Sequence, residues 1–304
     1  MAEYGAAGRR YEKMKKSRAL ALIIISSFMF ATSGIFVRLL GPYGFTSIQM
    51  TAMRGIVSAI TLTVFLLLTN RKSLKISFKG ILLFILSGAF MFLAAFFYYT
   101  AMGYTTIATA VVLMYAAPIY VLLYSVLFLK EKLTPMKIAA VIVMLVGMAL
   151  VSGIAGGMEF NFWGVFFAVL AGVAYAGYNI VAKLEMKHGY DPMTAMTYCY
   201  ITMGLVAGSC ADIPNMVELI GQSPLTLIPL ILGIGLLTCA IPYLLYTVSL
   251  KVVPAGTACV LALIEPMAAI IYSVVFFNEP LTVPLVVGVV LILSAVFMIS
   301  RIKE

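Results

Sequence analysis

The chain has 304 residues, of which 63% are hydrophobic and only 10% are charged, and its formal net charge is +9. Soluble domains have about 25% charged residues, so this chain has too few charges to cover an aqueous surface, and its mean hydropathy of +1.12 indicates a membrane protein. The basic residues lie at the ends of apolar runs and form no groove with aromatic residues between them, so we expect no binding of nucleic acid.

Apolar runs of membrane-spanning length follow one another along the whole chain. A helix needs about 20 apolar residues to cross about 30 Å of hydrocarbon. Cutting the chain at its polar, glycine and proline interruptions predicts ten transmembrane helices, at residues 19–40, 46–69, 80–101, 105–129, 136–153, 162–182, 192–211, 226–249, 255–277 and 281–300. Most connections are short, so we expect a compact, all-α antiparallel bundle in the membrane.

Positive charge predicts how these spans are oriented, because cytoplasmic loops are enriched in lysine and arginine. Residues 1–18 form a basic tail. With this tail in the cytoplasm, eighteen of the 20 basic residues lie on the same side and the five opposite connections have none. The eighteen are Arg9, Arg10, Lys13, Lys15, Lys16, Arg18, Arg71, Lys72, Lys75, Lys79, Lys130, Lys132, Lys137, Lys183, Lys187, Lys251, Arg301 and Lys303. We therefore expect a multi-pass protein of the plasma membrane with both termini in the cytoplasm.

The second half of the chain repeats the first. The segment from Ala108 to Thr134 recurs without a gap 148 residues later, from Gly256 to Thr282. Both copies contain a proline in the middle of an apolar run, Pro118 and Pro266, and such a proline removes a backbone hydrogen bond and kinks a helix. We therefore predict two repeats of five helices each, at residues 19–153 and 154–304, following the tail at 1–18.

An odd number of spans in each repeat places the second repeat upside down relative to the first. The sequence Lys130-Glu131-Lys132 of the first repeat becomes Asn278-Glu279-Pro280 in the second, so both lysines are lost where the charge rule requires it. Inverted repeats are frequent in alternating-access transporters, which bind substrate near the middle of the membrane between the repeats. A duplication that has only a structural role is the alternative.

These features together resemble a known family. The apolar run with a central proline that ends on Glu-x-Leu-Thr, present from Ala108 to Thr134 and from Gly256 to Thr282, resembles the EamA-type transporters of the drug/metabolite transporter superfamily, as do Ser33-Gly34 and Arg54. The Trp-Gly pair common in the first helix of that family is Ser33-Gly34 here. The resemblance covers nearly the whole chain, and it implies transport of small metabolites, often amino acids or other polar compounds and frequently outward.

Three ionisable residues lie inside the predicted spans, where a charge is costly unless it faces a cavity or a partner. Glu265 lies near the middle of its span, and its counterpart in the first repeat is Ala117. We hypothesise that Glu265 binds a coupling proton or a cationic group of the substrate, and a structural carboxyl group is the alternative. Arg54 could meet a substrate carboxylate, pair with Glu265 or have a structural role. Arg38 lies near a span end, where it can extend to the interface.

Aromatic and amide side chains within the spans complete a candidate pocket. Tyrosine hydroxyls deep in a bundle need partners and often line a wet cavity, although packing is the alternative for each of them. The candidate substrate-binding or coupling residues are Glu265, Arg54, Tyr98, Tyr115, Tyr175, Tyr178, Asn179 and Tyr246, with Tyr99 and Tyr243 as further tyrosines of the pocket and Pro118 and Pro266 as predicted kinks.

The sequence favours a secondary transporter over other membrane proteins. The single histidine, His188, lies in a polar connection, the four cysteines form no CxxC pair, and no lysine or histidine lies inside a span to activate a serine. We therefore expect no enzyme, no cofactor and no metal. The expected partners are a small-molecule substrate, protons where transport is coupled, and lipid, with the protein a monomer or homodimer. Export or exchange of amino-acid-like compounds and transport of an organic cation both stay open, with a membrane-embedded enzyme or a receptor as distant alternatives.

Overall fold

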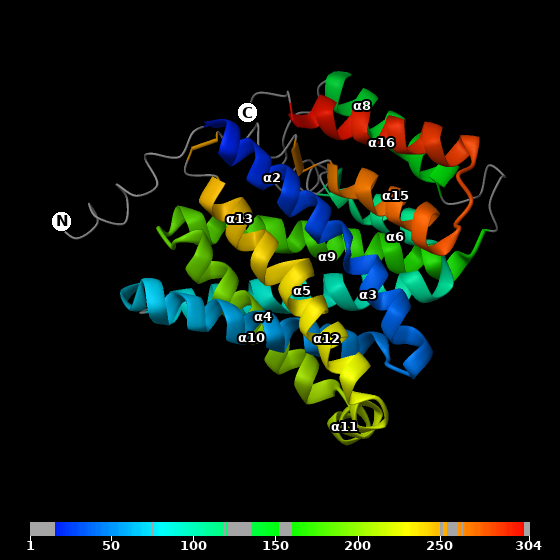
Figure 1. Ribbon diagram of the computed structural model, residues 1–304. Coiled ribbons are helices and arrows are strands. Elements are labelled where there is room, and N and C mark those ends of the chain that lie inside the picture. The colour runs from blue at the N-terminus through cyan, green and yellow to red at the C-terminus, as the bar shows by residue number, and fades with distance from the viewer. Residues whose placement is uncertain are drawn as a thin grey trace.

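The computed structural model describes residues 16–74, 76–117, 119–120, 135–151, 160–249, 252–253, 261–262 and 264–300. Within these ranges every regular element is a helix, and the helices form one layered bundle (Figure 1). Five segments are long and apolar enough to cross a membrane: Lys16–Tyr43, Ser47–Thr69, Phe78–Tyr104, Phe162–Lys187 and Pro224–Ser249. Shorter apolar helices cover Ile138–Val151, Ile264–Phe277 and Val283–Met298. The described part of the chain is therefore an all-helical, multi-pass membrane protein.

The first predicted span is divided into two helices. Helix α2 (Lys16–Ala31) ends where the Thr32 hydroxyl donates to the Met29 carbonyl oxygen at 2.6 Å, and α3 (Ser33–Leu40) follows at once. The short turn η1 (Gly41–Tyr43) ends at Gly44, whose φ of 89° lies in the left-handed region that favours glycine.

Three further helices of the first half, α4, α5 and α6, begin at polar N-caps close to the predicted span starts. Thr46 and Gln49 form a capping box at the start of α4, and the Thr106 hydroxyl accepts a hydrogen bond from the Thr109 backbone N–H at the start of α6. The described elements of this half after η1 are α4 (Ser47–Thr69), η2 (Arg71–Leu74), α5 (Phe78–Tyr104), α6 (Ile107–Met114) and α8 (Pro135–Val151). Pro118, the predicted kink of the fourth span, lies outside the described residues.

The second half contains one helix that the hydropathy pattern does not predict. This is α11 (Ile213–Gln222), a short amphipathic helix that lies across the direction of the others at the end of the bundle (Figure 1). The other elements are α9 (Phe162–Lys187), α10 (Pro192–Cys210), α12 (Pro224–Gly235), the π-helical turn η3 (Leu236–Ala240), α13 (Ile241–Ser249), α15 (Ile264–Phe277) and α16 (Val283–Ser300).

Glycines bring two helix pairs into close contact. Helix α4 packs along α10, and α8 packs along α16 at one side of the bundle (Figure 1). A Cβ atom on Gly55 would lie 2.8 Å from the Gly204 backbone, and one on Gly147 would lie 2.9 Å from the Gly288 carbonyl oxygen. Only glycine permits these approaches, in the manner of small residues at helix interfaces in membranes.

The outside of the bundle carries large apolar side chains. Leu68, Leu145 and Val290 are 77%, 57% and 57% exposed. An aqueous protein rarely exposes apolar side chains on such a scale, whereas lipid solvates them. This surface surrounds an interior in which hydroxyls, amides and charged groups gather.

Candidate functional site: a central polar cavity

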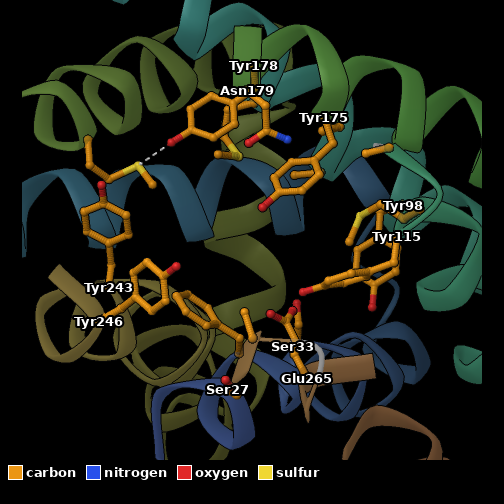
Figure 2. Close-up of a pocket in the computed structure, with 18 of the residues that line it drawn as sticks. Ser27, Ser33, Tyr98, Tyr115, Tyr175, Tyr178, Asn179, Tyr243, Tyr246 and Glu265 are labelled. Carbon is orange, nitrogen blue, oxygen red and sulfur yellow. Dashed lines mark hydrogen bonds between the residues drawn. The ribbon is translucent and has the colours of Figure 1, made fainter. Parts of the chain in front are cut away.

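A cavity of about 440 Å³ lies between helices from both halves of the chain. This volume is in the usual range for sites that bind small molecules. Figure 2 shows tyrosines of α9 and α13 on two sides of it and Glu265 on a third. The structure brings all eight predicted residues to this central cavity: Glu265, Arg54, Tyr98, Tyr115, Tyr175, Tyr178, Asn179 and Tyr246.

Glu265 provides the negative charge of the central cavity. It lies on α15 and is half-buried. Figure 2 shows its carboxyl group facing the Tyr115 hydroxyl, with Ser33 beside it. Ala117, the counterpart of Glu265 in the first repeat, lines the same cavity. Pro266 follows Glu265 on α15, and a kink at Pro266 stays a prediction.

Arg54 provides the positive charge and is held in a fixed orientation. Its Nη1 donates to the Tyr99 hydroxyl at 3.0 Å, its Nε donates to the Cys239 Sγ at 2.6 Å, and its guanidinium lies 5.8 Å from the Tyr99 ring centre. The Tyr99 hydroxyl also bonds the Ser33 hydroxyl at 3.2 Å. Cys239 belongs to the π-helical turn η3, a departure from α-helix that is frequent at functional sites.

The two charges of the central cavity are not paired with each other. Among the residues that the structure describes, the one ion pair is between Arg38 and Glu279. Glu265 and Arg54 therefore line one cavity as separate charges of opposite sign. Charges away from bulk water are costly unless a partner balances them, so each of the two is available to a ligand group of opposite charge.

The tyrosines surround the space between these charges. The Tyr175 and Tyr178 rings stack with their centres 5.9 Å apart. The Tyr178 hydroxyl donates to the Met196 Sδ at 3.8 Å, and the Tyr243 hydroxyl donates to the Pro192 carbonyl oxygen at 3.3 Å. The cavity thus offers aromatic faces to a ligand, whereas Tyr99 lies behind the wall and supports Arg54.

Beyond the cavity, a cluster of polar contacts joins the ends of α3, α6 and α15. Arg38 Nη2 donates to Glu279 Oε1 and to the Thr105 carbonyl oxygen, each at 3.1 Å. Both carboxylate oxygens of Glu279 accept a hydrogen bond from the Ile107 backbone N–H at 3.1 Å. Ile107 is the first residue of α6, and the first N–H groups of a helix have no partner within the helix. Arg38, which the sequence places near an interface, therefore has a partner 241 residues away.

Several lining residues were missed in the sequence. The central cavity is also lined by Ser27, Met91, Met196 and Tyr200. A serine or methionine in an apolar run carries no sequence signal that separates a cavity-lining position from a packed one. Cys239, one of the four cysteines that form no CxxC pair, contacts Arg54. Among the described residues, no group of three histidine, cysteine, aspartate or glutamate side chains lies close enough together to hold a metal ion.

Glu185 was also missed, because the predicted span ends at residue 182, whereas α9 continues to Lys187. Its side chain is only 1% exposed. The acidic residue directly after a long apolar run, within one helical turn, was the signal that could have identified it.

Comparison with known proteins adds to this geometry. The sequence model of the EamA-like transporter family matches residues 17–153 and again residues 162–301. An uncharacterized transporter of Archaeoglobus fulgidus is 28% identical over 281 residues, which cover 92% of this chain and 96% of the relative. The human protein named Solute carrier family 35 member G1 is 23% identical over 84% of this chain and 71% of its own length. A crystal structure with 15% identity superposes with a TM-score of 0.59 over 93% of this chain and 96% of its own, a likeness of fold alone.

Proposed function

The chain belongs to the EamA-like transporter family, and we propose that it is a secondary transporter that carries a small, zwitterionic, amino-acid-like metabolite through the central cavity. One observation supports this most: a carboxylate and a guanidinium line the same cavity without pairing. A ligand with an ammonium group and a carboxylate can balance both charges at once. Export or exchange at the plasma membrane is the expected task.

We propose the ten-helix inverted repeat as the architecture, with repeats at residues 19–153 and 154–304 and both termini in the cytoplasm. The pairing of helices supports it. Helices α4 and α10 occupy equivalent positions in the two repeats, as do α8 and α16, and each packs against its counterpart with a glycine from both sides. A twofold relation between the repeats produces such self-pairing of equivalent helices.

The proposed binding mode follows from the positions of the charged groups. Glu265 binds the ammonium group, with the Tyr115 hydroxyl beside it, and Arg54 binds the carboxylate. Charge-assisted hydrogen bonds of this kind are stronger than neutral ones. The tyrosine faces accommodate the substrate's side chain, and the Tyr175 and Tyr178 stack is the largest such surface.

Transport of an organic cation is the second candidate. Two of the nitrogen atoms of Arg54, Nε and Nη1, already donate to Cys239 and Tyr99, so Arg54 can also be read as a structural residue. Glu265 and the tyrosine faces would then bind a cation by charge and by cation–π contact. The response of transport to a substrate's carboxylate distinguishes the two candidates.

Alternating access requires that one end of the central cavity close while the other opens. The contacts of Arg38 and Glu279 join α3, α6 and α15 at one end of the bundle. We propose that they form the closure on the side opposite the termini, and that this closure breaks when the cavity opens to that side. The two halves of the chain meet in these contacts, which suits a rocking motion of one repeat against the other.

Exchange measurements in proteoliposomes test the proposal. The purified protein, with unlabelled compound inside, is given labelled neutral amino acids, choline, tetraethylammonium or sugars from outside. We expect exchange of amino acids that Glu265→Gln and Arg54→Gln each reduce and that Glu218→Gln, at an exposed glutamate of α11, leaves unaffected. Exchange of choline with no amino acid transport would favour the second candidate. No exchange of any compound across the panel would refute both.

A further inference from the structure

A second glutamate is buried in the bundle outside the central cavity. Glu185 lies on α9, seven residues after Tyr178, which is about two helical turns or 10 Å along the axis. Its side chain is 1% exposed, and its Oε1 atom has no hydrogen-bond partner. The cavity-lining residues do not include it, so its carboxyl group has no role in the binding mode proposed above.

Polar but uncharged groups face Glu185 from the neighbouring helices. The buried Ser87 hydroxyl of α5 lies beside its carboxyl group, the Cys199 thiol of α10 lies near both, and the Tyr243 hydroxyl of α13 lies within electrostatic range. Thr194 of α10 is also buried, and its hydroxyl oxygen has no partner. These groups can accept or donate a hydrogen bond, but none carries a positive charge.

The charged groups near Glu185 whose side chains the structure describes are engaged elsewhere or face outward. The Asp191 carboxylate accepts a hydrogen bond from the Met193 backbone N–H at the start of α10. Lys187 and His188, which follow Glu185 on its own helix and at its end, are exposed. No ion pair involves Glu185 in the part of the chain that the structure describes. A negative charge on Glu185 would therefore lie among neutral neighbours, which is costly away from bulk water.

A bound proton removes that charge, and the structure links this position to the central cavity. Tyr243, near Glu185, lines the cavity, and its hydroxyl donates to the backbone at Pro192. Cys199 lies one turn after Met196, which also lines the cavity and accepts from the Tyr178 hydroxyl. Glu185 therefore lies about two helical turns beyond Tyr178, among side chains that adjoin the cavity-lining Met196 and Tyr243.

We propose that Glu185 is the proton-binding residue that couples transport to a proton gradient, separate from Glu265, which holds the substrate. The proposal rests on the function proposed above, that the chain is a secondary transporter. While it is buried, Glu185 holds a proton. When α9 shifts against α10 and α13 while the cavity is open to one side of the membrane, Glu185 meets cavity water, releases its proton there and becomes a carboxylate. It takes up another proton from water when the cavity is open to the other side. One proton is bound and one released in each cycle, and no other reactant is consumed.

Infrared difference spectra of the purified protein, recorded between acid and alkaline pH, test proton binding without any substrate. We expect a titrating band of a protonated carboxyl group that is lost in Glu185→Gln, retained in Glu185→Asp, and unchanged in Glu218→Gln, an exposed glutamate. Size-exclusion profiles show whether each variant is folded. If Glu185→Gln does not fold, the spectrum of Glu185→Asp still tests whether the carboxyl group at this position binds a proton. A spectrum of Glu185→Gln identical to that of the wild type would overturn the proposal.

A transport measurement tests the coupling. Proteoliposomes with labelled neutral amino acids are assayed with a pH gradient, for accumulation, and without one, for exchange. We expect Glu185→Gln to lose accumulation above the equilibrium level while exchange continues, and Glu185→Asp to recover accumulation. A merely structural role would reduce both equally, and accumulation by Glu185→Gln at the wild-type level would overturn the coupling role. If the wild type moves none of the compounds, the proposed function and the coupling role both fail, whereas the infrared band still reports whether Glu185 binds a proton.

Discussion

Replacing Glu279 should open the central cavity toward the end of the bundle where α3, α6 and α15 meet. Its carboxylate bonds the Ile107 backbone N–H and the Arg38 side chain, all at 3.1 Å. Glu279→Ala removes both contacts, whereas Glu279→Gln keeps an oxygen for the Ile107 N–H and loses the charge. These contacts belong to the closed form of the proposed cycle. Both variants should therefore shift the equilibrium between closed and open forms toward the open form, by the free energy that the lost contacts contribute to the closed form.

The size of this shift follows from the exposure of the two side chains. The Glu279 side chain is 10% exposed, so its bond to the Ile107 N–H contributes about 1.5–3 kcal/mol, as for hydrogen bonds to charged groups. The Arg38 side chain is 37% exposed, so solvent reduces the ion pair to about 0.5 kcal/mol. Glu279→Ala should therefore cost at least about 2 kcal/mol, a roughly thirtyfold shift. Glu279→Gln should cost about 1 kcal/mol, or roughly fivefold.

Labelling of a cavity cysteine measures the shift. In a background without the four native cysteines, Ala94→Cys places a thiol on the cavity wall. A membrane-impermeant maleimide is added on the side opposite the termini, and the labelling rate is compared among the Glu279 variants. Glu218→Ala, at an exposed glutamate, is the matched control. We expect rates in the order alanine, glutamine, wild type.

Equal labelling rates in the wild type and Glu279→Ala would refute the reasoning, because the lost contacts would then stabilise neither form over the other. A rate for Glu279→Gln as high as that for alanine would show that charge alone holds this end closed, and that the bond to the Ile107 N–H contributes nothing.

Three further changes have defined outcomes. Gly55→Val should lower the melting temperature in detergent by an amount equivalent to about 1–3 kcal/mol of overpacking, since its Cβ would lie 2.8 Å from the backbone of α10, whereas Gly103→Ala, with nothing within 4 Å, should not. Tyr115→Phe should weaken substrate binding by about 0.5–1.5 kcal/mol, the usual value of one hydrogen bond, as measured by the half-saturation concentration of exchange. Arg54→Lys should transport as poorly as Arg54→Gln, because one ammonium group cannot replace the planar guanidinium that contacts Tyr99 and Cys239. Exchange at the wild-type rate in Arg54→Lys would contradict the role assigned to Arg54.

Much of the helical framework could be predicted from the sequence. Within the described residues, α4 begins and ends within one residue of the predicted span 46–69, and α10 coincides with 192–211 to the same accuracy. Apolar runs of this length have one way to satisfy their backbone in lipid, which makes hydropathy a strong signal. The candidate residues gathered at one cavity for a related reason: a tyrosine, arginine or glutamate inside a span needs a polar environment. Their roles in binding stay predictions.

The contacts between distant residues could not be predicted. The partner of Arg38 lies at Glu279, and that of Arg54 at Cys239, because tertiary packing decides both. Helix α11 is too short and too polar to register as a span, and its amphipathic pattern has meaning only at the edge of the bundle. Glu185 was not predicted as a buried residue because the predicted span ended a few residues too early. The end of an apolar run does not coincide with the end of its helix.

Competition by ligands that differ by one charge tests the central claim most directly. The amino acid that the wild type exchanges fastest is compared with its decarboxylated amine and its N-acetyl derivative. We expect the wild type to prefer the intact amino acid over both. Arg54→Gln should lose the preference over the amine, and Glu265→Gln should lose the preference over the N-acetyl form. Equal competition by the amine in the wild type, with no change in Arg54→Gln, would contradict the account and favour an organic cation.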